Sequence, residues 1–84
     1  MSVNPMEPCL SRAVVVGMHA DVDAQMRAAP VLRNRAYVVR CEDPASPFRH
    51  MCDDVPSYPA VRLGGQVLVG VQTEADLARA CARF

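Results

Sequence analysis

The sequence predicts a single α/β domain in which a four-stranded mixed sheet carries flanking helices. Two observations support this prediction. In the first half, a short apolar run rich in valine precedes a helix-forming stretch and a second such run, which is typical of parallel strands joined by a right-handed crossover. In the second half, two short apolar runs flank a pair of glycines, which predicts a tight antiparallel hairpin. With a capped helix at the end, the expected order is β-α-β-(α)-β-β-α.

The first half contains two predicted strands and one predicted helix. Residues 13–18 are Ala-Val-Val-Val-Gly-Met, a continuous apolar run that fits a central strand buried on both faces. Asp21 or Asp23 is expected to cap a helix that runs to about Ala29. Residues 36–41 are the second predicted strand. This half therefore predicts a β-α-β unit.

The second half contains the hairpin and the last helix. Residues 60–63 and 66–69 are its two predicted strands. Residues 48–54 are expected to form a short helix, which a nearby proline ends. Residues 73–76 resemble a capping box with aspartate in place of the usual glutamate. The helix behind this box places three apolar residues on one face, namely Leu77, Cys81 and Phe84.

The first residues of the chain predict an irregular arm and indicate the cellular compartment of the protein. Residues 1–12 carry two prolines and no periodicity, so we expect an irregular N-terminal arm, with the domain over residues 13–84. The basic and apolar segments of a cleaved signal peptide are absent from this start. No apolar run approaches the roughly 20 residues of a membrane span, so no membrane insertion is expected. These features predict a cytoplasmic protein, in a compartment that keeps thiols reduced.

Charge and composition exclude two classes of protein. Nine arginines balance nine acidic residues, so the net charge is zero and no basic block is present. A nucleic-acid partner is therefore not expected. Because 51% of the residues are hydrophobic and only 21% are charged, a disordered chain is not expected either.

The four cysteines are the unusual chemical resource of so short a chain. They lie at positions 9, 41, 52 and 81, and no two of them have a C-x-x-C spacing. This disfavours a zinc ribbon and a standard thioredoxin-type redox centre. A metal site assembled from Cys41, Cys52, His19 and His50 lacks the familiar zinc spacings, so no metal is expected.

The stretch from residue 55 to residue 77 carries a family resemblance. Its motifs are Tyr58-Pro59-Ala60, Gly64-Gly65 and Gly70-Val71-Gln72. Together with the element order, they resemble the thioredoxin-like domain attached to vitamin K epoxide reductase homologues. The resemblance implies a minimal thioredoxin-like fold over residues 13–84. It also implies a cis peptide bond before Pro59, in a loop that holds the substrate of active relatives by backbone pairing. Without the C-x-x-C, the alternative is that this loop only shapes the turn into the third strand. Cys41 and Cys52 match two cysteine positions of that family.

The chain departs from the family at the position of its chemistry. Members of the family carry C-x-x-C between the first strand and the first helix, where a low-pKa thiolate and a resolving thiol exchange disulfides. Here residues 17–23 are Gly-Met-His-Ala-Asp-Val-Asp, without cysteine. The usual dithiol mechanism is therefore absent from that site. A glutathione site would need a second glycine at the start of the last helix, where residues 70–73 are Gly-Val-Gln-Thr, so no cofactor is expected.

Two functions are compatible with this pattern. The first is a binding or structural module without the standard dithiol centre, which contacts a protein partner near Tyr58 and Pro59. The alternative is a non-standard thiol–disulfide oxidoreductase whose catalytic residues, Cys41 and Cys52, cycle between dithiol and disulfide. Acidic neighbours of both cysteines disfavour a thiolate. This favours the first function and leaves enzyme activity uncertain.

The state of the cysteines stays open at this point. A disulfide between Cys41 and Cys52 would stabilise the fold by about 3 kcal/mol through loop closure, whereas two buried thiols would pack as small hydrophobic groups. Cys9 is interpreted as an incidental thiol on the arm, or as one that forms mixed or intermolecular disulfides. A third class, a regulatory subunit that docks a partner through an exposed Cys9, is also open. Cys81 is expected in the core.

Overall fold

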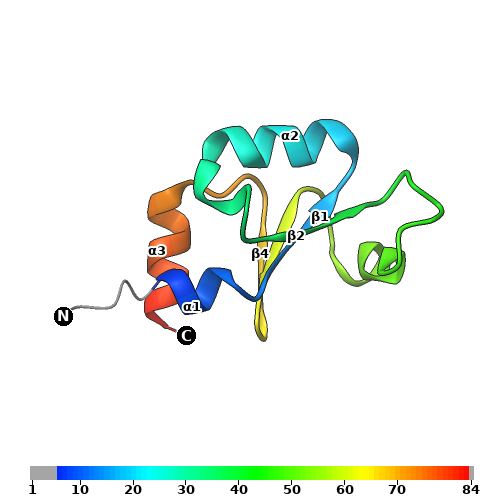
Figure 1. Ribbon diagram of the computed structural model, residues 1–84. Helices are drawn as coiled ribbons and strands as arrows, with labels where there is room; N and C mark the ends of the chain where they lie inside the picture. The colour runs from blue at the N-terminus through cyan, green and yellow to red at the C-terminus, as the bar shows by residue number, and fades with distance from the viewer. Residues whose placement is uncertain (1–5, 84) are drawn as a thin grey trace.

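The computed structural model of the protein describes residues 6–83 and contains one sheet with flanking helices (Figure 1). The elements in chain order are α1 (Met6–Leu10), β1 (Ala13–Gly17), α2 (His19–Ala28), the 3₁₀ helix η1 (Pro30–Leu32), β2 (Tyr37–Arg40), the 3₁₀ helix η2 (Arg49–Asp54), β3 (Ala60–Leu63), β4 (Gln66–Val69) and α3 (Glu74–Ala82). The strand order in the sheet is β2-β1-β3-β4. β1 is parallel to β2 and antiparallel to β3, and β3 is antiparallel to β4. The predicted four-stranded mixed sheet is thereby confirmed.

β1 is a central strand because it is apolar on both of its faces. On one face, Val15 is in register with Val38 of β2 and Val61 of β3. On the other face, Val16 is also in register with one residue of β2 and one of β3. Val15 and Val16 are both fully buried. A strand that buries both faces has a continuous apolar sequence, as predicted for residues 13–18.

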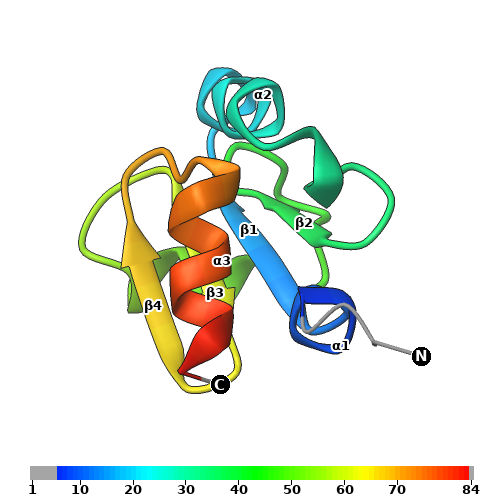
Figure 2. The same ribbon diagram turned by 90° about the vertical axis from the view of Figure 1, so that its left-hand side faces the viewer.

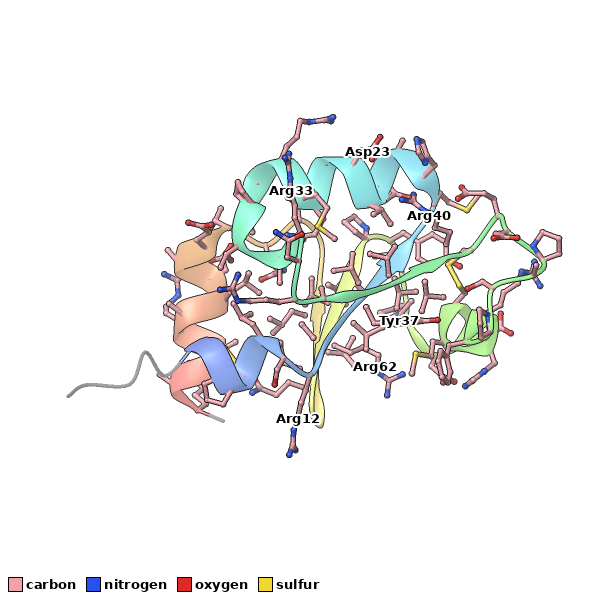
Figure 3. All side chains as sticks on the ribbon, viewed as in Figure 1. Arg12, Asp23, Arg33, Tyr37, Arg40 and Arg62 are labelled. Carbon is pink, nitrogen blue, oxygen red and sulfur yellow. A yellow bond between two sulfur atoms is a disulfide. The ribbon has the colours of Figure 1, made fainter. Side chains whose placement is uncertain are left out.

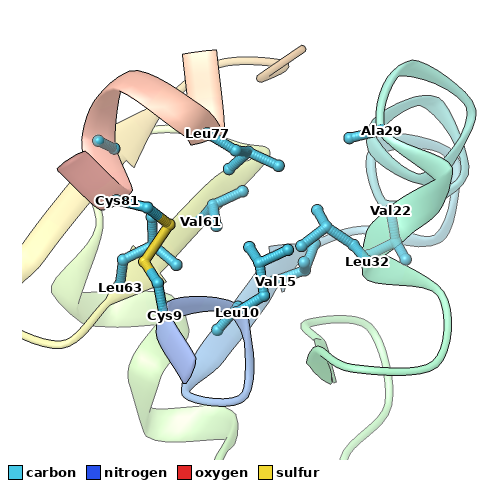
Figure 4. Close-up of a cluster of buried hydrophobic side chains, with 12 residues drawn as sticks. Cys9, Leu10, Val15, Val22, Ala29, Leu32, Val61, Leu63, Leu77 and Cys81 are labelled. Carbon is cyan, nitrogen blue, oxygen red and sulfur yellow. A yellow bond between two sulfur atoms is a disulfide. The ribbon is translucent and has the colours of Figure 1, made fainter. Parts of the chain in front are cut away.

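The sheet face that carries Val15 packs against α1, α2 and α3 (Figure 2). The apolar side chains of these helices and of β1 and β3 form one buried cluster (Figure 4). Its members are Cys9, Leu10, Ala13, Val15, Val22, Ala29, Leu32, Val61, Leu63, Leu77, Ala80 and Cys81. The prediction that Leu77 and Cys81 face the core is confirmed, and Phe84 lies outside the described residues.

The opposite face of the sheet is covered only in part. There η2 packs against β1 and β2, around a smaller buried cluster of Val16, Val39, Cys41 and Cys52. On β4, the side chains of Val67 and Val69 point to this same face and are exposed. The short helix predicted over residues 48–54 is therefore present as η2, and it leaves the β4 side of the face open to solvent.

The irregular arm predicted over residues 1–12 is wrong for the part that the structure describes. Residues Met6–Leu10 form the helix α1, and both Cys9 and Leu10 are buried. The physical reason is tertiary: α1 packs against α3, and a disulfide joins Cys9 to Cys81. A segment with weak local signals is thus ordered by contacts with the far end of the chain. Residues 1–5 of the predicted arm lie outside the described residues.

The helix caps agree with the sequence in one case and differ in the other. At α3, Thr73 Oγ1 accepts from the Asp76 N–H at 3.1 Å and Asp76 Oδ2 accepts from the Thr73 N–H at 2.9 Å, which confirms the capping box. At α2 the N-cap residue is Met18 and not Asp21 or Asp23, but Asp21 takes part in the cap from the third helical position, because its side chain accepts from the Met18 N–H. No helix among residues 6–83 is long and apolar enough to span a membrane.

Candidate functional site

The loop formed by Tyr58 and Pro59 lies beside the end of β1. The register pairs Val16 with Ala60, so Gly17 faces Pro59 across the strands. A Cβ atom added to Gly17 would lie 3.5 Å from Pro59 Cα and 3.0 Å from Asp21 Cβ. A side chain at position 17 would therefore be in contact with Pro59 and tightly packed against the first turn of α2, which favours glycine there.

The Tyr58–Pro59 loop is fixed at three points. The peptide bond between the two residues is cis, as predicted from the sequence. Pro59 is buried, and its carbonyl oxygen accepts from the Gly70 N–H at 2.8 Å. The Tyr58 hydroxyl donates to the Cys52 carbonyl oxygen at 3.3 Å. The Tyr58 side chain is nevertheless 37% exposed. No hydrogen bond among the described residues uses its backbone N–H or carbonyl group.

The first turn of α2 lies next to this loop. Backbone N–H groups at its start already donate hydrogen bonds to carboxylates. Asp21 Oδ2 accepts from the Met18 N–H at 3.2 Å, and Glu42 Oε2 accepts from the His19 N–H at 2.6 Å. The free N–H groups of a helix start attract anions. Here carboxylates of the chain itself accept from two of these groups, the N–H groups of Met18 and His19.

Cys41 and Cys52 form a disulfide directly behind the loop. The sulfur atoms are 2.07 Å apart, and the two residues are only 7% and 8% exposed. The Cys41 N–H donates to the Gly17 carbonyl oxygen at 3.0 Å, and Arg49 Nε donates to the Cys41 carbonyl oxygen at 3.1 Å. The structure thus brings together all four residues singled out as site residues, Cys41, Cys52, Tyr58 and Pro59, and the bonded state of the pair is confirmed.

Three of the four acidic residues beside this disulfide have partners of their own. Glu42 holds the start of α2 as described above. Asp43 Oδ1 accepts from the Ala45 N–H at 2.9 Å. Asp54 Oδ2 lies 3.7 Å from Arg62 NH1 on β3. These three carboxylates therefore accept hydrogen bonds from backbone N–H groups or form an ion pair.

The second disulfide was missed by the sequence reasoning. Cys9 is bonded to Cys81, 72 residues later, and is only 1% exposed. The interpretations of Cys9 as an incidental thiol, as a site of mixed or intermolecular disulfides and as an exposed docking point are therefore wrong. All four cysteines are disulfide-bonded. The signal available in the sequence was the even number of cysteines, which does not by itself give the pairing.

Both histidines contact other side chains. His19 Nδ1 lies 3.0 Å from Arg40 NH1, which can only donate, so Nδ1 accepts. The proton of a neutral His19 is then on Nε2, which is 3.3 Å from Asp23 Oδ2. The His50 ring has its edge toward Phe48. Among the described residues, no group of three or more His, Cys, Asp and Glu side chains could hold a metal ion.

The chain matches no protein-family model, no curated protein and no solved structure. The thioredoxin-like relationship therefore stays a prediction that depends on motifs and geometry alone.

Proposed function

We propose that the chain is a thioredoxin-like binding module, which holds an extended segment of a partner protein at the Tyr58–Pro59 loop. The parallel pair of β1 and β2 and the antiparallel hairpin of β3 and β4 support this, because they form the kind of mixed sheet expected from the element order and the resemblance. The position of Pro59 beside Gly17, at the start of α2, supports it as well.

One observation carries the proposal. The backbone N–H and carbonyl of Tyr58 have no partners among the described residues, on a loop that two hydrogen bonds hold in place, one from the Tyr58 hydroxyl and one to the Pro59 carbonyl. A rigid segment with free backbone groups is what strand addition requires, since the loop loses little freedom on binding. The exposed side chain of Tyr58 supplies an aromatic contact beside these groups, and aromatic residues are enriched at interfaces.

The same geometry disfavours dithiol chemistry at the start of α2. Met18 and Asp21 have the spacing of the two cysteines in a C-x-x-C, but neither is a thiol. A reactive thiolate is stabilised by the N–H groups of a helix start. Two of those groups already donate to the carboxylates of Asp21 and Glu42. The surface beside Pro59 is thus suited to contact and not to exchange.

The alternative function is thiol–disulfide exchange at Cys41 and Cys52. The observation in its favour is that this disulfide lies behind the binding loop. The Cys52 carbonyl oxygen accepts a hydrogen bond from the Tyr58 hydroxyl. In such a reaction a thiolate of a dithiol reductant attacks one sulfur, and the other leaves as a thiolate of the chain. Because both cysteines are more than nine-tenths buried, the attacking thiolate has little access. A structural role for this disulfide is therefore preferred.

The cysteine pairing bears on the compartment. Stable disulfides are rare in the reducing cytoplasm and common in oxidising compartments. Two disulfides in a chain of 84 residues therefore favour an oxidising compartment over the cytoplasm that the sequence analysis predicts.

Binding is tested with octapeptides selected from a random phage-displayed library against the folded, oxidised protein. We expect a selected peptide to shift the NMR signals of Tyr58 and its neighbours and to slow hydrogen exchange of the Tyr58 N–H. Peptides that bind without protecting this N–H would contradict the proposal.

Catalysis is tested by the reduction of a disulfide-containing peptide with dithiothreitol. The Cys41→Ala/Cys52→Ala variant is compared with wild type, and Cys9→Ala/Cys81→Ala is the control that removes the other disulfide. We expect none of the three proteins to accelerate the reaction. Acceleration that only Cys41→Ala/Cys52→Ala abolishes would establish the oxidoreductase instead.

A further inference from the structure

A groove of about 470 Å³ lies between α2 and β2, on the sheet face that carries the larger core cluster. Three of its lining side chains are apolar and come from both elements, namely Val22, Met26 and Val38. Three others are the arginines at positions 27, 33 and 40, and a single carboxylate, that of Asp23, accompanies them. On a chain without net charge, this groove is a local concentration of positive charge.

The carboxylate of the groove does not neutralise its arginines. Asp23 Oδ2 lies 3.3 Å from His19 Nε2, and the other nitrogen of His19 binds Arg40. The guanidinium groups of Arg27 and Arg33 make no hydrogen bond or ion pair with the side chains and backbone that the structure describes. Figure 3 labels Asp23 on α2 and Arg33 and Arg40 near the two ends of this helix. The groove therefore has unused capacity for anionic groups.

The backbone of β2 adds a second kind of binding capacity. β2 is an outer strand of the sheet, with β1 as its only neighbour among the described residues. The Cys41 N–H points to β1, because it donates to Gly17. Backbone groups alternate in direction along a strand, so the N–H groups of Val38 and Arg40 point away from the sheet. These are also the two β2 residues whose side chains line the groove.

The other side of this edge is aromatic. Tyr37 of β2 is exposed, and its ring packs edge-on against the exposed ring of Phe48, with 5.3 Å between the ring centres. Tyr37 lies on the sheet face opposite the groove, because side chains alternate along β2. A strand placed beside β2 would thus meet basic groups on one face and aromatic rings on the other.

We infer that the β2 edge binds an acidic, extended segment of a partner protein, which adds to the sheet as a fifth strand. Its alternate carboxylate side chains point into the groove toward Arg27 and Arg33, and its apolar side chains lie beside Tyr37. Charge complementarity selects this edge over the β4 edge, whose strand Gln66–Val69 carries no charged residue. The openness of the groove along a free edge favours an extended peptide over a small anion, which needs a more enclosed site. This surface is separate from the Tyr58–Pro59 loop and does not depend on it.

The test uses three capped peptides of the same length with soluble Gly-Ser ends. Their central segments are Glu-Val-Glu-Val-Glu, Lys-Val-Lys-Val-Lys and Glu-Glu-Glu-Val-Val. We expect the alternating acidic peptide to bind with at least tenfold higher affinity than either control, by isothermal titration or fluorescence anisotropy. It should also slow hydrogen exchange of the Val38 and Arg40 N–H groups and leave that of Tyr58 unchanged. Equal binding of the three peptides would overturn the inference.

Matched variants test which arginines bind the acidic peptide. Arg27→Gln/Arg33→Gln removes two exposed guanidinium groups without disturbing the core, and Arg12→Gln removes an exposed arginine that does not line the groove. We expect the double variant to weaken binding of the alternating acidic peptide at least tenfold and the control to leave it unchanged. An unchanged affinity of the double variant would contradict the inference. So would full competition by millimolar citrate with no protection of the β2 N–H groups, because the groove would then bind small anions only.

Discussion

The side chain of Gln25 binds both polar groups of the Gln72 backbone. Its Nε2 donates to the Gln72 carbonyl oxygen and its Oε1 accepts from the Gln72 N–H, each at 2.7 Å. Gln25 lies on α2 and is fully buried, whereas Gln72 lies in the segment that leads into α3. This pair of bonds replaces water for two backbone groups and joins the two helices that cover the same face of the sheet.

Replacement of Gln25 is expected to destabilise the fold strongly. Gln25→Ala leaves two part-buried backbone groups of Gln72 without their side-chain partners, which lowers the free energy of unfolding by about 3 kcal/mol. Gln25→Met keeps the length of the side chain but neither polar atom, so it should lose a similar amount. Urea denaturation measures both variants. A Gln25→Met protein as stable as wild type would show that packing, and not hydrogen bonding, is what position 25 contributes.

The two disulfides are expected to differ in their contribution to stability. Cys9 and Cys81 close a loop across 72 positions, and Cys41 and Cys52 close one across 11. Loop-closure entropy then predicts losses of about 4 and about 3 kcal/mol when each pair is replaced by alanine. Denaturant unfolding of the two double variants gives the comparison. A larger loss for Cys41→Ala/Cys52→Ala would mean that packing around η2 outweighs loop closure.

The parts of the fold predicted from sequence are those with local signals. The apolar run of β1 and the capping box at Thr73 depend on residues within a few positions of one another. The N-terminal helix and the bond from Cys9 to Cys81 could not be predicted in this way, because both depend on contact with α3. The start of α2 was placed too late, since Asp21 is a favoured cap residue but instead accepts from Met18 within the first turn.

The candidate sites show the same limit. Cys41, Cys52 and Pro59 were found because a motif resemblance gave their positions. The groove between α2 and β2 was not predicted from the sequence, because its arginines come from three separate segments and none belongs to a basic run. Gln25 was missed for another reason: a polar residue between apolar helix positions is normally solvent-exposed, and its partner is 47 residues away.

Gly17→Ala is expected to disturb the first turn of α2. The new Cβ atom would lie 3.0 Å from Asp21 Cβ, closer than such atoms normally approach, so the first turn of α2 must move by a few tenths of an ångström. Overpacking of this kind costs about 1–3 kcal/mol. Gly65→Ala is the matched control, because an added Cβ there meets no atom within 4 Å. Calorimetry should show a lower Tm for Gly17→Ala and little change for Gly65→Ala; equal melting temperatures would contradict the close approach.

Asp76 is expected to make stability depend on acid pH. Its hydrogen bonds from the Thr73 N–H and hydroxyl, and then the charge of Arg79, hold the pKa of its carboxyl below the usual value of 3.8. A group whose pKa is lower in the folded state stabilises it above the unfolded pKa, and this stabilisation is lost as pH falls through the folded pKa. Asp76→Asn should therefore lower the Tm at pH 7 more than at pH 2. An equal loss at both values would assign the effect to the amide substitution alone.

A C-x-x-C introduced at the start of α2 tests the thioredoxin-like relationship most directly. Met18→Cys/Asp21→Cys places two thiols at that spacing, beside Pro59, in a protein whose own cysteines are all bonded. Loss of the Asp21 carboxylate also frees the Met18 backbone N–H, which can then stabilise a thiolate. We expect the variant to accelerate reduction of a disulfide peptide by dithiothreitol, whereas Met18→Ser/Asp21→Ser does not. If the introduced pair forms a disulfide in thiol titration but gives no acceleration, the loop at Pro59 does not present substrates as the proposed function requires.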